Sequence, residues 1–420
     1  MESFHISTSG IGPAIEKEYD RVFSPISALQ HGMPIEFHIV GTSLFYISLK
    51  DSYFDIKFKI TNPDGGDLDG AATVGPVNLV SHAIFKNIEL SLNGKQISEP
   101  TNNYPFRAYI ETLLNYTSNV QEKRLVVEGW AMDTAGHFAD TNANAGDNTA
   151  LVSRKAWITT SHSVRMIFHP SLDIFHQDGD IPPNTDIKIR LLPNVETFFL
   201  MANIDNTAYH FSLQSIHFWA RTHEVFASYL LPQQAQLLSG LSFLIKMPSV
   251  KIKTLSIPTG SVRVELDNIF MGLLPHRIIL GLAQADHMNG TWQSNPFHFQ
   301  HYGVTSLMLK VNGEQIPRDG YNPLFTGETD YIRDYFQVLQ ALDLDTDTAH
   351  AFSLTPTEWA NGSTLFAFKL FPNQSSLQRS GTVKLEMRFG AQTQHVITII
   401  LLSESTSSIE IDKYKNILEK

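Results

Sequence analysis

Hydrophobic and polar residues alternate along many short segments of this chain, and the alternation has a period of two. From Phe54 to Ile60 the apolar residues occupy every second position, and Asp55, Lys57 and Lys59 lie between them. The same pattern recurs at 88–92, 187–191, 262–266 and 383–389. A strand with this pattern turns one face to a core and the other to water. Because Asn-Gly, Asp-Gly and Pro turns separate the segments, the pattern predicts an all-β sandwich or barrel.

Helical periodicity is scarce. It is confined to three short segments, Pro105–Tyr116, Pro232–Leu238 and Asp330–Leu342. We therefore expect short helices in the connections between strands and no helical domain.

One stretch of the chain is repeated about half a chain length later. Leu90–Ile97 and Leu309–Ile316 share the core Asn-Gly-x-Gln-Ile, with Asn93-Gly94 in the first copy and Asn312-Gly313 in the second. Asn-Gly between alternating segments predicts a tight hairpin, because both central residues need a positive φ. In each half a loop containing proline, a helix with an early Tyr-Ile pair and a closing strand follow in the same order. This common order favours a duplication over a chance match of two hairpins.

Composition limits the functions that the chain can have. A length of 420 residues exceeds what one core usually organises, so two domains are expected. The formal charge is −11, and no run of Lys or Arg is present, so we expect no direct tight nucleic-acid binding. Cysteine is absent, which excludes disulfides and thiolate metal sites. Neither a secretory leader nor an apolar run of membrane-spanning length is recognisable.

The sequence contains no catalytic pattern. A nucleophile elbow, a phosphate-binding glycine loop and a zinc-protease helix motif are all missing, so we expect no enzyme activity, no catalytic residues and no cofactor. Acidic groups occur at Asp64/Asp67/Asp69, Asp178/Asp180 and Asp343/Asp345/Asp347, and three evenly spaced histidines at His162, His169 and His176. None has the spacing of a complete metal site, so we interpret them as solvated loop or strand-edge residues and predict no metal ligands. The polar stretch Met132–Ala150 is expected to be an exposed loop.

Several longer motifs resemble one protein family. They are PIEF (34–37), VGPVNL (74–79), LNG (92–94), YPFRAYIETLL (104–114), LDNIFMG (266–272), LPHRIILG (274–281), NPFHF (295–299), LFAF (365–368) and IEID (409–412). Their content and order are similar to the major capsid proteins of Polinton (Maverick) elements and adintoviruses. The resemblance spans roughly residues 30 to 415, and the loop Met132–Ala150 departs from it.

The resemblance implies a double jelly roll, that is, two tandem eight-stranded jelly rolls. The first is expected at 31–210 and the second at 211–402, with an N-terminal arm at 1–30 and a C-terminal tail at 403–420. At least one of these ends is expected to reach neighbouring tiles or minor proteins. The segment Phe211–Val225 is expected to close the first half or to bridge to the second.

The resemblance also implies a virion protein that is made in the cytoplasm or nucleus of a host cell and is not secreted. Three copies would form a pseudo-hexagonal homotrimer that tiles an icosahedral shell around double-stranded DNA. Its partners would be further copies of itself, penton proteins and minor capsid proteins.

Two other interpretations remain. A carbohydrate-binding or adhesive β-sandwich would need aromatic residues gathered in a groove, and the five tryptophans are dispersed along the chain. A cupin-type enzyme would need a clustered His/Glu metal set, which the sequence does not reveal.

Overall fold

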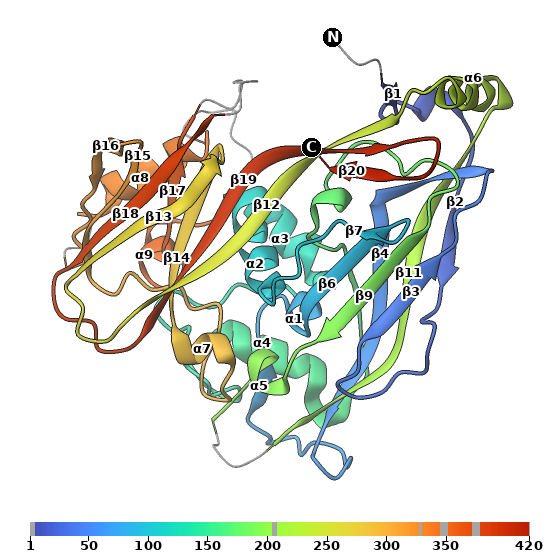
Figure 1. Cartoon of the computed structure of the whole chain (residues 1–420). Helices are drawn as coiled ribbons and strands as arrows, with labels where there is room; N and C mark the ends of the chain where they lie inside the picture. Colours follow the sequence, from blue (N-terminus) through green and yellow to red (C-terminus); the bar gives the residue numbers. More distant parts are fainter. Residues whose placement is uncertain (1–4, 204–207, 327–329, 345–351, 372–378, 420) are drawn as a thin grey trace.

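The computed structural model describes residues 5–203, 208–326, 330–344, 352–371 and 379–419. Its strands form two β-sandwiches that lie side by side, with a group of helices between them (Figure 1).

The first sandwich is built from two four-stranded sheets. One has the order β2 (Ile15–Phe23), β11 (His210–Val225), β4 (Phe45–Thr61) and β8 (Val164–Phe168). The other has the order β3 (Ile35–Ile39), β9 (Ile187–Pro193), β6 (Phe85–Leu92) and β7 (Lys95–Gln96). Aromatic side chains fill the space between the sheets: the rings of Phe37 and Phe54, one from each sheet, lie 5.3 Å apart and edge to face.

The second sandwich has the same plan. One sheet contains β12 (Phe243–Ile257), β19 (Ile397–Ile411), β14 (Arg277–Gln284) and β17 (Leu365–Lys369), with β1 (Ile6–Ser7) and β20 (Ile417–Glu419) added at β12 and β19. The other contains β13 (Arg263–Leu273), β18 (Ser380–Phe389), β15 (Val304–Val311) and β16 (Glu314–Tyr321). Tyr321 joins the two sheets, since its ring lies 5.2 Å from that of Phe366. A small ladder of β5 (Val74–Pro76) and β10 (Leu200–Ala202) completes the strands of the described ranges.

Strand order shows that the two sandwiches are copies of one topology. Counted along each half, one sheet holds the first, eighth, third and sixth strands and the other holds the second, seventh, fourth and fifth. This order is that of a jelly roll, so the predicted all-β double jelly roll is confirmed. All sheet pairings within the two rolls are antiparallel, whereas β1 joins β12 in parallel.

The Asn-Gly pairs occupy equivalent places in the two rolls. Each lies between the fourth and fifth strands, with φ of 47° and 84° at Asn93 and Gly94, and of 50° and 91° at Asn312 and Gly313. Each asparagine also bonds the backbone at the seventh strand. The side-chain oxygen of Asn93 accepts from the amide of Asp186 (2.8 Å), and that of Asn312 accepts from the amide of Thr382 (3.0 Å). The turn therefore fixes the hairpin onto its neighbouring strand as well as reversing the chain.

Helices occupy the connections, as expected. They are α1 (Val80–Ala83), α2 (Tyr104–Asn115), α3 (Ser118–Lys123), α4 (Thr149–Ile158), α5 (Glu196–Phe199), α6 (Ala227–Leu238), α7 (Ala285–Asn289), α8 (Ile332–Ala341) and α9 (Pro356–Ala360). The three predicted helices correspond to α2, α6 and α8, and α6 begins five residues earlier than its apolar pattern indicates. Short 3₁₀ turns lie at Gly12–Ala14, Leu125–Glu128, Thr159–Ser161 and Asp173–Phe175. None of these helices is long and apolar enough to cross a bilayer.

The strand pairing differs from the expected boundaries of the rolls. β2 lies within the segment 1–30 that was expected to be an arm, yet it pairs with β11 along the edge of the first roll. Its alternation is hard to recognise because most of this edge strand is exposed on both faces. β11 closes the first roll instead of opening the second, and β19 runs through the expected boundary at 402. The rolls accordingly span 15–225 and 243–411.

The polar stretch Met132–Ala150 is not the exposed loop that its composition predicts. Asp133 and Phe138 within it are buried, and the amide of Gly136 donates to the carbonyl of Asn361 in the second roll (2.7 Å). The stretch can be buried with few apolar residues because its buried polar side chains form hydrogen bonds with one another, for example Asn148 with Asp133.

Candidate functional site at the junction of the two rolls

Helix α2 lies at the centre of the molecule, between the rolls (Figure 1). It belongs to the long connection between the fifth and sixth strands of the first roll, and Pro105 starts it in the first turn, where a missing amide proton costs nothing. Every residue from Tyr104 to Leu114 is buried. A helix that is buried on all sides must pack against more than one element, and here those elements come from both rolls.

An aromatic cluster joins α2 to the second roll. The ring of Phe297, in the connection between β14 and β15, stacks on Tyr109 with centroids 4.3 Å apart and planes 1° from parallel. Phe106 and Phe198 meet the same ring edge to face, at 5.9 and 6.0 Å. Such geometries are favourable for aromatic quadrupoles and add to the burial of apolar area. The two rolls therefore share part of their core.

A buried ionic network lies beside this cluster. Asp133 pairs with Arg154, and both side chains are fully buried. The carboxylate also accepts from Asn148 (2.9 Å) and from Asn295 of the second roll (3.0 Å). Arg154 donates in addition to the carbonyls of Pro76 and Ala131. A buried ion pair is tolerated when its remaining hydrogen-bonding capacity is satisfied, and this network satisfies it across the junction.

A second network connects α2 to β12. Arg107 donates to Glu111 (3.0 Å), to Asp173 (2.6 Å) and to the carbonyl of Val250 in β12 (3.1 Å). The amide of Val250 donates back to Asp173 (3.0 Å). Burial raises the pKa of Glu111 to about 7, and the charge of Asp173 adds to this effect while Arg107 opposes it. One guanidinium thus serves two carboxylates, and burial makes Glu111 a weaker acid than an exposed glutamate.

A cleft of about 1070 Å³ opens next to Glu111, between the rolls. His176, Lys246, Arg277 and Glu404 are among the residues that line it. The Oε2 atom of Glu111 accepts no hydrogen bond from the described part of the chain and lies 3.7 Å from Nε2 of His176. Burial, together with the charge of Arg107, lowers the pKa of His176 to about 4, so this imidazole is neutral at pH 7.

Backbone contacts complete the junction. The amide of Ala202 donates to the carbonyl of Trp292 (2.7 Å). Gly290, with a φ of 82°, approaches Phe198 so closely that a Cβ atom there would lie 2.8 Å from its backbone. The first hairpin also contacts the C-terminal segment through a side chain, because the side-chain amide of Asn93 donates to the carbonyl of Lys415 (3.0 Å). Together these contacts join the two rolls along several separate segments of the chain.

The residues that the sequence singles out as possible ligands do not converge on one site. His162 is exposed, His169 contacts Glu128 at 3.4 Å, and His176 contacts Glu111. In the acidic groups, Asp64 and Asp69 accept from backbone amides in their own turns, Asp178 pairs with Lys50, Asp180 with His223, and Asp343 with Arg277. Asp345 and Asp347 lie outside the described residues.

Sequence reasoning did not find the residues of the junction. Tyr109, Asp133 and Arg154 belong to the long connection between β7 and β8, and Asn295 and Phe297 belong to the connection between β14 and β15. No spacing rule relates the two sets. The motifs YPFRAYIETLL and NPFHF contain three of these five residues, so the unusual composition of the two motifs was the available signal. The sequence also gave no sign of a metal-ligating set, yet the fold brings His31, Glu196 and His210 together.

The strand order and the shared core define a double jelly roll held as one body, and comparisons with known proteins agree with that fold. A chain of the Sputnik virophage structure superposes with a TM-score of 0.61 over 100% of this chain and 91% of that chain, at 12% identity. The crystal structure of the mavirus major capsid protein gives 0.51 over 96% and 90%, at 10% identity, and the Faustovirus major capsid protein gives 0.53 over 94% and 90%, at 9% identity.

In sequence, the chain is 23% identical to an uncharacterised protein of Caenorhabditis elegans over 384 residues, which are 87% of this chain and 88% of the worm protein. No family model matches the chain.

Proposed function

We propose that this chain is a major capsid protein of the kind encoded by Polinton elements and adintoviruses. The observation that carries the proposal is the joining of two equivalent jelly rolls through a shared core and two polar networks. A shell tile needs subunits that keep a fixed shape while making several similar contacts, and this unit meets that need. The likeness to viral capsid proteins over nearly the whole chain supports it, as do the motifs that resemble Polinton capsid proteins.

The proposed tile is a homotrimer. Three chains with two similar rolls each present six similar sides, so one trimer fits six neighbours in a shell although its true symmetry is threefold. Such tiles would cover an icosahedral shell around double-stranded DNA. The similarity to a nematode protein supports placement among elements that reside in animal genomes.

The proposal includes the partners and the location of the protein. The chain contacts other copies of itself, penton proteins and minor capsid proteins in the virion, and it is made in the cytoplasm or nucleus of the host cell. It holds no cofactor and catalyses no reaction. Because its net charge is −11, it encloses the genome without binding the DNA phosphates tightly.

Electron microscopy of material purified from cells that express the full chain, with and without the minor capsid proteins of its element, tests the proposal. We expect six-sided trimeric tiles with the chain alone and closed shells in the mixture. Uniform monomeric particles in both preparations would contradict a capsid role. The variant Asp133→Asn should be imaged in the same way. It loosens the junction and should reduce the yield of regular tiles.

A further inference from the structure

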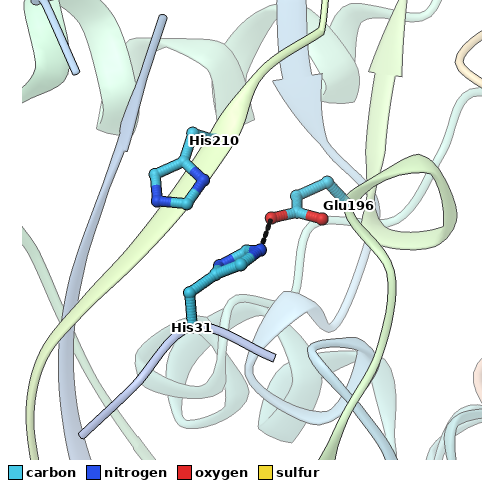
Figure 2. Close-up of side chains that lie close together, drawn as sticks. All are labelled: His31, Glu196 and His210. Carbon is cyan, nitrogen blue, oxygen red and sulfur yellow. Dashed lines mark ion pairs between the residues drawn. The ribbon is translucent and has the colours of Figure 1, made fainter. Parts of the chain in front are cut away.

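Three potential metal ligands converge at one end of the first roll. The ligand atoms of His31, Glu196 and His210 all lie within 4.8 Å of one another. Nε2 of His31 is 3.4 Å from Oε1 of Glu196, and the two imidazole rings have centroids 4.3 Å apart with planes at 45°. Figure 2 shows the three side chains approaching one another from three separate segments.

The jelly-roll topology is the reason that these residues meet. His31 lies in the connection between the first and second strands of the roll. Glu196 begins α5, in the connection between the seventh and eighth strands, and His210 is the first residue of the eighth strand, β11. Both connections lie at the same end of the roll. At His210 the strand β11 pairs with Thr61 of β4, whereas β2 joins its other edge only from Phe218 onward. The connection with His31 lies beside this open edge.

The donor set suits a borderline transition metal. Two imidazoles and one carboxylate are a ligand combination that holds Zn²⁺, with a fourth position left for water. In a tetrahedral site with bonds of about 2.0–2.2 Å the ligand atoms lie roughly 3.3–3.5 Å apart. The His31–Glu196 distance already has this value, and the ligand atom of His210 lies within 4.8 Å of both. Hard cations such as Mg²⁺ and Ca²⁺ prefer oxygen ligands and are rarely bound by two imidazoles.

The surroundings allow a metal ion to enter and to be held. The side chain of His31 is 52% exposed and that of Glu196 only 19%, so the site is open on one side and supported on the other. Oε1 of Glu196 also accepts from the amide of Phe211 (3.4 Å), which orients the carboxylate. His31 and His210 line a cavity of about 260 Å³ that also has Ile35, Phe85 and Leu213 in its wall. An apolar wall on the protein side limits competition by water.

We propose that His31, Glu196 and His210 bind one divalent transition metal ion, with Zn²⁺ as the expected occupant. The bound ion joins the connection at 24–34 to the start of α5 and to the start of β11, so it fastens one end of the first roll. The proposed site does not depend on the proposed capsid role, and measurements of metal binding alone test it. Because protons compete for the imidazole nitrogens, the affinity falls as the pH is lowered.

Calorimetric titration of the full-length protein with Zn²⁺ tests the site, together with the visible spectrum of added Co²⁺. The expected result is one ion per chain, a tetrahedral Co²⁺ spectrum and a rise in the melting temperature on addition of Zn²⁺. In His31→Ala and in His210→Gln the affinity should fall about tenfold or more, because a lost ligand costs at least as much as a lost supporting contact.

His217→Gln is the matched control, since His217 lies on the same strand as His210 and is half-buried outside the cluster. It should bind Zn²⁺ as the unaltered protein does. His31 is exposed, so His31→Ala should keep its melting temperature without metal, and this measurement separates lost binding from lost folding. Equal Zn²⁺ binding by the unaltered protein, His31→Ala and His210→Gln would overturn the proposal, as would an equal loss in the control.

Discussion

The rings of Tyr109 and Phe297 lie parallel, 4.3 Å apart, although one belongs to the first roll and the other to the second. Tyr109 is in the central helix α2, and Phe297 is in the connection between β14 and β15 of the second roll. Both side chains are essentially inaccessible to solvent. The apolar contact between the rolls is therefore an extension of a protein core and differs from the polar, separable interface of two independent domains.

Truncating the central ring should destabilise the whole molecule. We expect Phe297→Ala to lower the free energy of unfolding by about 3–5 kcal/mol, because it removes a buried ring and leaves a cavity at the junction. Chemical denaturation followed by tryptophan fluorescence measures this loss. The control is Phe336→Ala, at a ring that is 46% exposed on α8, for which the change should be about 0.5 kcal/mol or less. Similar losses in the two variants would mean that the stacked pair does not hold the rolls together.

The buried pair of Asp133 and Arg154 gives a second prediction. Asp133→Asn removes the charge that compensates a fully buried guanidinium, so we expect a loss of about 3–5 kcal/mol. Asp319→Asn is the matched control, because Asp319 pairs with Arg333 at 3.2 Å on the surface and such pairs contribute about 0–1 kcal/mol. The double variant Asp133→Asn/Arg154→Met should recover part of the stability. A double variant less stable than Asp133→Asn would argue against an uncompensated charge as the cause.

The carboxyl group of Glu111 makes stability depend on pH. Its pKa in the folded protein is about 7, above the ordinary value of 4.5, so the folded protein holds a proton that the unfolded chain releases. The stabilisation is complete below about pH 4.5 and is lost as the pH rises through 7. Between pH 5 and pH 8 the unaltered protein should therefore lose up to about 3 kcal/mol more stability than Glu111→Gln, which cannot ionise.

Urea denaturation at several pH values measures this difference. Asp173, Arg107 and His176 surround Glu111 and are present in both proteins, so the comparison isolates the one carboxyl group. Parallel stability curves for the two proteins would show that Glu111 is already ionised below pH 5.

The two Asn-Gly turns give a fourth prediction. Asn312 has a positive φ, and its side-chain oxygen accepts a hydrogen bond from the amide of Thr382. Asn312→Ala should therefore lower the free energy of unfolding by about 1–2 kcal/mol, because alanine tolerates this φ less well and cannot form the bond. Asn312→Gly keeps the backbone conformation and loses only the side-chain bond, so its cost should be about 1 kcal/mol. The same pair of substitutions at Asn93 should give the same order, because the two turns are equivalent. The interpretation fails if the glycine variant is less stable than the alanine variant at both turns.

Local patterns in the sequence identified the strands β4, β6, β9, β13 and β18, the duplication and the helix α2. Alternation at 54–60 and 383–389 is strong because one face of each strand is buried, and α2 is recognisable from its closely spaced apolar residues. The edge strand β2 was missed for the opposite reason, since exposure on both faces leaves little alternation.

The junction and the histidine cluster could not be predicted from local patterns. Asp133 lies in a polar stretch that suggests an exposed loop, and only the approach of Asn295 from the other roll shows why it is buried. His31, Glu196 and His210 are brought together by the order of the strands, which no spacing along the chain encodes.

The mass of the purified full-length protein in solution tests the central proposal most directly. Light scattering at micromolar concentration should give three times the chain mass of 47.2 kDa, because a capsid tile with six similar sides requires three copies of a two-roll chain. A stable particle with the mass of a single chain under the same conditions would contradict the proposal that this protein builds a shell from trimers.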